Sequence, residues 1–207
     1  MRKVMPLLAP ATLLVVFSFN LPGWAQEGPN RPQAKPVTLE GKTTAILVLD
    51  LSARCHDPKE VCSKLIAGVG EFLERARAAS VPIIHTVSSS AKGTPLAEVA
   101  APLKRRAAEP VIYPDGFDKF IGGEIQDFLK ARGIKGVVIV GASANVAVLY
   151  TATTAARIYR YNVTIPMDGV ISRSHYEQEY TFHQFTVLAS RANQLFQFTN
   201  LSMIGFQ

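Results

Sequence analysis

Residues 44–51 read TAILVLDL, a continuous apolar run that ends in an acid. Runs of this kind are typical of strands that helices cover on both faces of a sheet. Residues 137–140 (VVIV) form a second such run, shortly after a stretch at 123–132 in which apolar residues recur with helical spacing. Strands that alternate with helices over short connections predict a parallel sheet with helices on both faces.

The remaining elements continue this alternation along the chain. We expect further strands at 81–87, 111–113 and 162–166, an edge strand at 196–199, and helices at 60–79, 145–159 and 176–188. The sequence therefore predicts an α/β fold, a doubly wound three-layer α/β/α sandwich with a mostly parallel sheet. In such folds, ligand sites lie beyond the carboxyl ends of the strands.

The composition is that of one folded domain. The chain has 207 residues, of which 48% are hydrophobic and 18% charged, and this balance excludes disorder over most of its length. Its two cysteines are too few for a disulfide scaffold or a multi-cysteine zinc module. The formal net charge is +6, but apart from residues 104–106 (KRR) the excess is not clustered. A nucleic-acid interface needs a basic stripe with aromatic residues, so we expect no nucleic-acid partner.

The first 25 residues have the pattern of an export signal. They read MRKVMPLLAPATLLVVFSFNLPGWA, with two cations, an apolar run at about 7–19, and small residues at Gly23 and Ala25. The apolar run is shorter than the ~20 residues that a membrane span needs, so we expect cleavage after Ala25 and no stable membrane span afterwards. The mature protein is then periplasmic or secreted.

Residues 26–42 (QEGPNRPQAKPVTLEGK) differ in composition from the rest. They hold three prolines, two glycines and few apolar residues, which predicts a proline-rich linker or an extended arm. The remaining residues, 43–207, are enough for one sizeable core and form the expected globular domain.

Four segments in a fixed order resemble one known superfamily. They are residues 47–50 (LVLD) at the end of a strand, 117–120 (FDKF) before a helix, 141–148 (GASANVAV) after a strand, and Asp168 after another. This order is similar to that of the isochorismatase-like (cysteine hydrolase) superfamily, which includes nicotinamidases and N-carbamoylsarcosine amidases. The resemblance covers roughly residues 43–188 and implies an isochorismatase-like, Rossmann-like fold.

The catalytic residues that the resemblance implies are an aspartate, a lysine and a nucleophilic cysteine. Asp50 matches the aspartate, but the lysine position holds Pro114 and the cysteine position, six residues after Gly141, holds Ala147. A methyl group cannot attack a carbonyl, and a thiolate needs nearby positive charge to lower its pKa. We therefore do not expect the ordinary cysteine-hydrolase mechanism.

Two charged residues are the catalytic candidates that remain. Asp50 could serve as a general base or an electrostatic anchor, or it could only cap the loop that follows its strand. Lys119 is five residues past Pro114, and it could reach back into the cleft or stand in solvent at a helix start.

Four further residues are candidates for ligand binding at the same edge: His85, Phe117, Ser143 and Asn145. Ser143 and Asn145 stand where a strand meets a helix N-terminus, so we expect N–H groups there to point into the cleft and favour an anion. The resemblance implies an oxyanion hole in this loop and a cis peptide bond at Ala142–Ser143.

Cys55 and Cys62 are seven residues apart. In an oxidising compartment this spacing favours a disulfide, and the alternative is that Cys55 is a relocated nucleophile.

A metal site is a separate question. Some family members bind zinc through an Asp-x-His pair, but here the residue two positions after Asp50 is Ser52, so this pair is absent. Asp50, His56 and His85 could form an improvised site. We expect no metal and no cofactor.

Two classes of function remain open. The first is an exported hydrolase-fold enzyme that acts on a small amide, ester or vinyl ether, with Asp50 as the base and the Ser143–Asn145 loop as the oxyanion site. The second is a catalytically inactive binding or assembly protein of the same fold. Small residues at 151–156 (TATTAA) suit close helix packing, and members of the superfamily often form oligomers, so we expect a homo-oligomer. In both classes the partner at the cleft is a small-molecule ligand.

Overall fold

The computed structural model of the protein describes residues 31–207. The export signal expected at 1–25 and the first residues of the arm lie outside this part of the chain. Within it, no helix is long and apolar enough to cross a membrane.

The described chain forms one large parallel sheet in the order β4-β3-β2-β5-β6-β8, with β7 paired to the end of β5. The strands are β2 (Thr44–Leu49), β3 (Ile83–Thr86), β4 (Val111–Ile112), β5 (Gly136–Ala142), β6 (Asn162–Pro166), β7 (Val170–Ile171) and β8 (Phe196–Thr199). The expected strands, including the edge strand β8, are confirmed. The two most apolar runs form β2 and β5, which pair with each other in the middle of the sheet.

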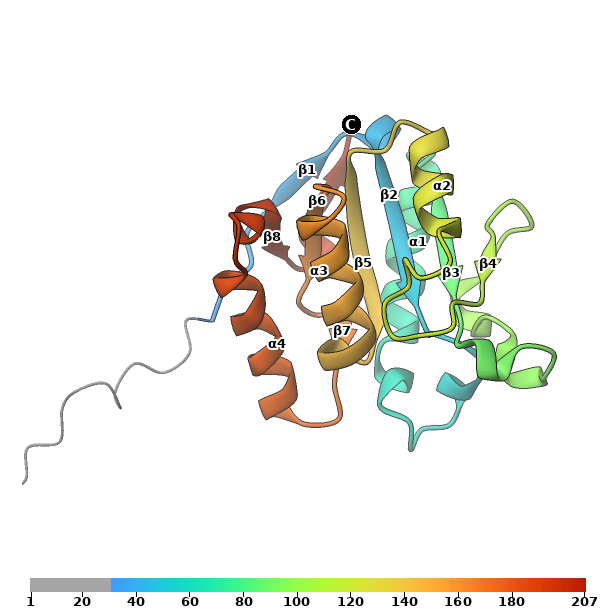
Figure 1. Cartoon of the computed structure of the whole chain (residues 1–207). Helices are drawn as coiled ribbons and strands as arrows, with labels where there is room; N and C mark the ends of the chain where they lie inside the picture. The colour runs from blue at the N-terminus through green and yellow to red at the C-terminus, as the bar shows by residue number, and fades with distance from the viewer. Residues whose placement is uncertain (1–30) are drawn as a thin grey trace, which may run out of the picture.

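Helices cover both faces of this sheet (Figure 1). The helices α2 (Glu124–Ala131), α3 (Leu149–Arg157) and α4 (His175–Val187) lie on one face, and α1 (Ile66–Ala78) lies on the other. Successive strand residues point to opposite faces. Leu47 therefore packs with α2 to α4, whereas Ile46 and Val48 pack with α1. The predicted three-layer α/β/α sandwich is confirmed.

Two of the predicted helices do not begin as regular α-helix: one starts with a tighter 3₁₀ turn and the other with a wider π-type turn. The helix expected at 60–79 starts as a 3₁₀ turn over Val61–Lys64 before α1. The helix expected at 145–159 starts as a π-type turn over Ala144–Val148, in which the N–H groups of Val146 and Val148 both donate to the carbonyl of Ser143. This wide turn lies at the carboxyl end of β5.

The expected linker at 26–42 is in part a folded element. Strand β1 (Val37–Leu39) pairs in parallel with β9 (Ile204–Phe206) in a separate two-stranded sheet, and the Phe206 ring packs 6.0 Å from that of Phe72 on α1. The folded domain therefore begins before residue 43. Its partner strand lies at the other end of the chain, so local composition carries no sign of this pairing.

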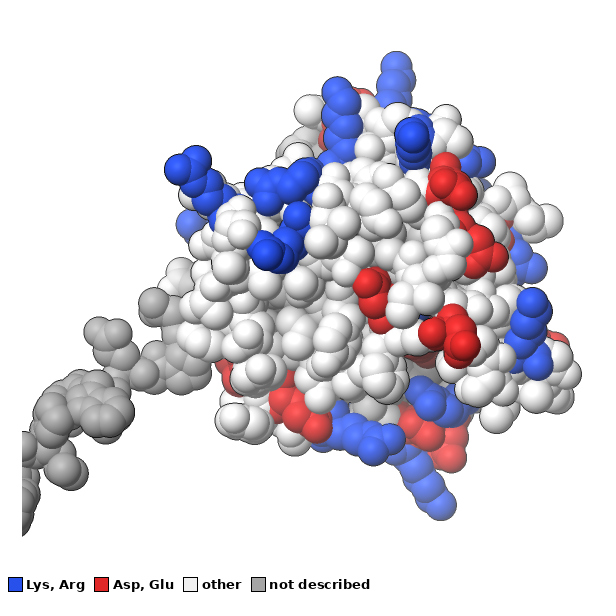
Figure 2. All heavy atoms as spheres, in the orientation of Figure 1, with Lys and Arg blue, Asp and Glu red and all other residues white. Residues whose placement is uncertain are grey.

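Much of the surface over α2, α3 and α4 is uncharged, and a few acidic side chains stand near the middle of this face (Figure 2). Lysine and arginine side chains stand at separate places around the edge of this face rather than in one stripe. Exposed apolar residues on the three-helix side include Tyr150 and Tyr180. The expected homo-oligomer stays a prediction.

Candidate functional site

A cleft of about 840 Å³ opens at the carboxyl ends of the central strands. Its walls come from the loops after β2 and β3, the turn before α2, the β5–α3 connection and the residues just before α4. This is the edge of the sheet at which the sequence predicts the site. The residues that line this cleft include Asp50, Arg54, Lys119, Asn145, Ala147 and Arg173.

Asp50 stands directly after β2, where the main chain turns with a φ of 57° and its N–H donates to the carbonyl of Thr86 at 3.0 Å. Its Oδ2 lies 2.8 Å from Nζ of Lys119, and its buried Oδ1 accepts no hydrogen bond from any described residue. Burial raises the pKa of Asp50, and the positive charges of Lys119 and Arg54 and the nearby main-chain N–H of Ser88 oppose this rise. The carboxyl group is therefore anchored through Oδ2 by Lys119, whereas Oδ1 has no hydrogen bond of ordinary geometry.

The sequence left open whether Lys119 reaches into the cleft or stands in solvent, and the structure places it in the cleft. Its side chain is only 2% exposed, and Nζ donates to the carbonyl of Gly116 at 3.4 Å as well as pairing with Asp50. The turn that carries Lys119 is bound to α3: the main-chain N–H of Lys119 donates to Oγ1 of Thr151 at 3.0 Å. The structure thus places a lysine ammonium beside Asp50, although Pro114 occupies the position that the resemblance assigns to a lysine.

Ala147 lies in the π-type turn and lines the cleft, with 3% of its surface exposed. No thiol can take its place from elsewhere, because both cysteines of the chain are used in a disulfide. The cleft therefore offers an acid and an ammonium group without a thiol nucleophile.

The loop after β5 has the cis peptide bond at Ala142–Ser143 that the resemblance implies. Its polar groups bind one another: Oγ of Ser143 donates to Oδ1 of Asn145 at 2.9 Å, and the N–H of Asn145 donates to Oγ of Ser172 at 3.2 Å. The N–H of Asn145 is therefore bound within the protein, although Ser143 and Asn145 both line the cleft. Ser172, just after β7, lies 27 residues away in sequence and supplies its acceptor.

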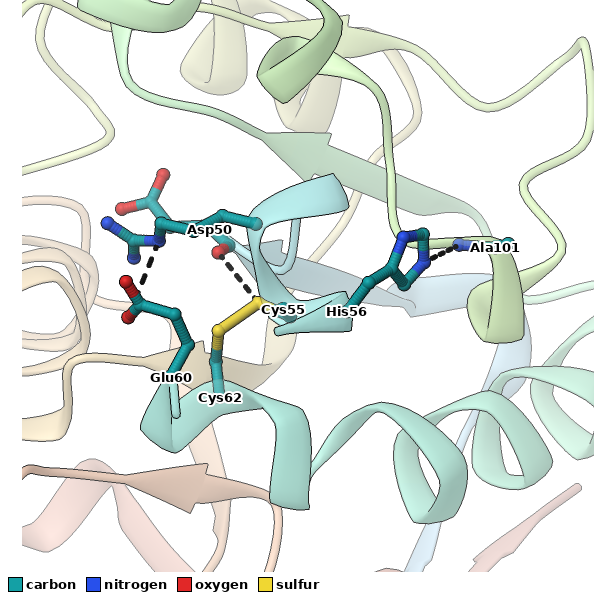
Figure 3. The surroundings of a disulfide bond; sticks show 7 residues. Asp50, Cys55, His56, Glu60, Cys62 and Ala101 are labelled. Atoms are coloured by element: carbon teal, nitrogen blue, oxygen red, sulfur yellow. Dashed lines mark hydrogen bonds and ion pairs between the residues drawn. A yellow bond between two sulfur atoms is a disulfide. The ribbon is translucent and has the colours of Figure 1, made fainter. Parts of the chain in front are cut away.

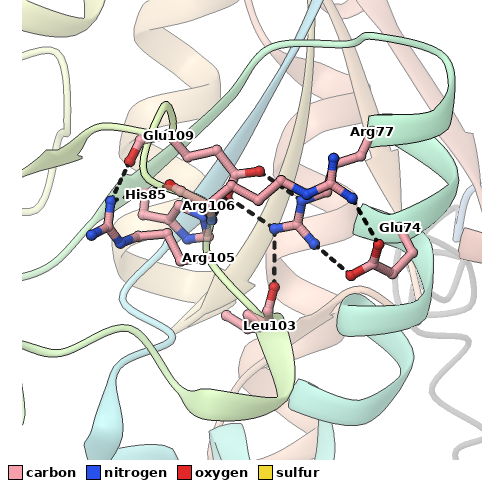
Figure 4. A network of polar contacts seen from close by, with 7 residues as sticks. All are labelled: Glu74, Arg77, His85, Leu103, Arg105, Arg106 and Glu109. Carbon is pink, nitrogen blue, oxygen red and sulfur yellow. Dashed lines mark hydrogen bonds and ion pairs between the residues drawn. The ribbon is translucent and has the colours of Figure 1, made fainter.

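His85 does not line the cleft, so its assignment as a binding residue is wrong. Ile84 of β3 points to the α2–α4 face, so its neighbour His85 points to the α1 face, where its Nε2 donates to Glu109 at 3.1 Å. Glu109 also binds Arg77 of α1 through both carboxylate oxygens, at 2.6 and 2.9 Å (Figure 4). Nor does His56 join Asp50, because its Nε2 accepts the N–H of Ala101.

Phe117 lines the mouth of the cleft, where its side chain is 65% exposed and its ring stacks on that of Tyr150, with ring centroids 6.3 Å apart.

Two cations of the cleft, Arg54 and Arg173, were not predicted from the sequence. Arg54 could have been found from its place four residues after Asp50, beyond the end of a central strand. Arg173 lies before α4, where no local pattern distinguishes it.

Cys55 and Cys62 are joined, with an S–S distance of 2.11 Å (Figure 3). The bond connects the 3₁₀ turn Ala53–His56 to the turn before α1, and both cysteines are buried. Sγ of Cys55 lies 3.8 Å from the carbonyl oxygen of Asp50, a contact rather than a hydrogen bond because a bonded sulfur carries no proton. The disulfide therefore holds the loop that brings Arg54 to the cleft.

Comparison with known proteins agrees with this architecture. A secreted isochorismatase effector, Isc1, of Verticillium dahliae (strain VdLs.17) is 28% identical over 148 residues, which cover 67% of this chain and 77% of the relative. A cysteine hydrolase from Pseudomonas syringae pv. phaseolicola 1448A matches with a TM-score of 0.68 and 16% identity, over 84% of this chain and 95% of that one. The MAR1 ribonuclease of Caenorhabditis elegans matches with a TM-score of 0.66 and 24% identity, over 80% and 81%.

The two structural neighbours are too distant in sequence to indicate more than a shared fold, and their different names illustrate that a fold does not set a substrate. A family model is more specific: the isochorismatase domain matches residues 44–194. Because this match spans well over half of the chain, the protein belongs to the isochorismatase family.

Proposed function

We propose that the protein is an exported, thiol-independent hydrolase of a small vinyl ether that carries a carboxylate, with Asp50 as the general acid. The observation that carries this proposal is Asp50 itself. Burial raises its pKa, Oδ2 is held by Lys119, and Oδ1 makes no hydrogen bond in the described structure. Such a carboxyl group can hold a proton on Oδ1 and deliver it to a bound molecule.

Vinyl ethers fit this cleft better than amides or esters. Hydrolysis of an amide or ester by the ordinary family route needs a nucleophile to attack the carbonyl, and Ala147 provides none. Hydrolysis of a vinyl ether instead begins with a proton on carbon and ends with water, so an acid is the main requirement. Isochorismate, from which the family takes its name, carries a vinyl ether and carboxylates, and the name of the Verticillium relative supports the same chemistry.

The reaction balances with water as the only co-reactant. Asp50 transfers the proton from Oδ1 to the terminal CH₂ carbon of the vinyl ether, and the ether oxygen stabilises the resulting cation. Water adds to the cationic carbon and returns a proton to Asp50. The hemiketal then loses the alcohol, and its carbon becomes the ketone of pyruvate.

Neighbouring cations have roles in this scheme. Lys119, 2.8 Å from Oδ2, stabilises the Asp50 carboxylate after proton transfer. Arg54 and Arg173 line the same cleft and provide positive charge for a substrate carboxylate.

The second candidate is an inactive binding protein of the same fold. One observation favours it: alanine lines the cleft at the position where the family resemblance implies the nucleophile. Such a protein would bind a small carboxylate through the same cations and would turn nothing over.

The test is pyruvate release from isochorismate by the mature protein. We expect turnover that persists after treatment with iodoacetamide and is lost in Asp50→Asn, by roughly 100-fold or more, the usual contribution of a general acid. Asparagine tolerates the positive φ of residue 50, so the main chain is kept. Binding of isochorismate without pyruvate release would favour the inactive protein, and turnover by Asp50→Asn would overturn the role of Asp50.

A further inference from the structure

The turn that carries Lys119 is held from α3 by two hydroxyl groups. Thr154 Oγ1 donates to Oδ2 of Asp118 at 2.6 Å, and Thr151 Oγ1 accepts the N–H of Lys119 at 3.0 Å. Thr151 and Thr154 are three residues apart, so they lie on the same face of the helix. Thr151 is fully buried, which makes its hydrogen bond expensive to break.

The residues on both sides of Lys119 are fixed as well. The second carboxylate oxygen of Asp118 accepts the N–H of Phe120 at 3.0 Å, which closes the turn locally. The Phe120 ring is 4% exposed and packs against Tyr159 and Tyr161, with centroid distances of 5.0 and 6.5 Å. The main chain therefore has its position and direction set before and after Lys119.

With its main chain fixed, Lys119 extends its side chain into the buried space beside β2. Its Nζ is held by the carbonyl of Gly116 and by Oδ2 of Asp50. We propose that Thr151 and Thr154 are positioning residues, which hold residues 116–120 so that Lys119 supplies the ammonium group beside Asp50 from five residues beyond Pro114. The inference deepens the proposed function, since it explains how the acid–base pair is assembled in a chain with proline at the expected lysine position.

The helix that forms this attachment directly follows the turn that bears Ala147. The hydroxyl of Thr154 matters because it binds the carboxylate of Asp118, and hydrogen bonds to charged groups are stronger than neutral ones.

The charged groups that act on the pKa of Asp50 are Lys119 and Arg54. Three further charged residues, Asp115, Arg173 and Glu177, line the same cleft.

The test uses the mature protein without substrate and compares Thr151→Val and Thr154→Val with the wild type. Thr153→Val on the same helix is the matched control, because Thr153 is half-buried like Thr154 but is not one of the two threonines that bind residues 118 and 119 in the described structure. Thr154→Ser keeps the hydroxyl and serves as the rescue variant. Acylation of Lys119 by acetic anhydride, followed by peptide mass spectrometry, measures how often the buried amine becomes accessible.

We expect acylation of Lys119 to rise by at least about tenfold in Thr154→Val and in Thr151→Val, and to stay within about twofold of wild type in Thr153→Val and Thr154→Ser. The carboxyl carbon of Asp50, followed by NMR, should titrate at higher pH in both valine variants, because the lysine that lowers its pKa is held less firmly. Lys119→Met marks the full extent of that shift.

Unchanged acylation and an unchanged Asp50 titration in folded valine variants would overturn the inference. If Thr151→Val fails to fold, Thr154→Val decides alone, because Thr154 is only half-buried. Neither measurement involves turnover. A protein that releases no pyruvate yet shows these shifts therefore contradicts the proposed function and leaves the positioning role intact.

Discussion

The ammonium group of Lys119 lies 2.8 Å from the carboxylate of Asp50 and is almost completely buried. The two residues come from different layers, one from the end of the central strand β2 and the other from the turn before α2. Their pairing gives the cleft an acid–base pair in the absence of a thiol.

Turnover should fall as pH rises. A general acid is active while protonated, and burial raises the pKa of Asp50, so activity is present below that pKa and is lost as pH increases through it. Lys119→Met removes a charge that lowers this pKa, so the decline should move to higher pH. Initial rates across pH check both statements, and activity that grows with pH would instead indicate a general base.

A thiol introduced by Ala147→Cys should react with iodoacetamide in the folded protein. Residue 147 lines the cleft that also holds Lys119, whose positive charge favours a thiolate. The added sulfur atom occupies a nearly closed position and should cost about 1–3 kcal/mol of the free energy of unfolding. Ala152→Cys is the control, because that residue is fully buried on α3 and does not line the cleft. Equal labelling of the two variants would contradict the position of residue 147.

The native protein should contain no thiol that reacts before reduction. Cys55 and Cys62 are bonded, and replacing both with alanine should lower the free energy of unfolding by about 2.5 kcal/mol, as expected for so short a loop. The same double variant should raise KM, because it frees the loop that carries Arg54. Labelling with and without reductant checks the bond, and urea unfolding checks the energy. Two reactive thiols in the unreduced protein would revive Cys55 as a nucleophile.

Glu109→Gln should destabilise the fold by about 3 kcal/mol, because it removes the buried counter-charge of Arg77 and leaves only the more exposed Glu74 beside it. Burial raises the pKa of Glu109, but hydrogen bonds from His85 and Arg77 outweigh burial and lower it from 4.5 to about 2. A lowered carboxyl pKa adds stability that is present above 4.5 and is lost as pH falls toward 2. The variant should therefore lose less stability than wild type between those values.

Glu74→Gln is the matched control for this network. Glu74 binds the same Arg77 at 3.1 Å, but its side chain is 41% exposed, so the substitution should cost less than about 1 kcal/mol. Urea unfolding of both variants at pH 3 and pH 7 measures the difference. An equal loss of stability in the two variants would show that burial of Glu109 is not what makes its ion pair matter.

Local sequence was sufficient for the layers of the fold. The apolar runs at 44–51 and 137–140 became adjacent central strands, and the acid Asp50 in the first became a cleft residue. Both outcomes follow from short-range rules. A continuous apolar run must be covered on both faces, and parallel strands bring their carboxyl ends to one edge.

The direction of individual side chains was decided only by the tertiary structure. The main chain of Lys119 is held by Thr151, 32 residues away, and His85 is held by Glu109, 24 residues away. Strand β1 has its partner at the opposite end of the domain. A side chain goes where its charge or hydrogen bond is satisfied, and those partners come from segments that only folding brings together. The sequence by itself therefore determined where the cleft lies, whereas the tertiary structure decided that Lys119 enters it and His85 does not.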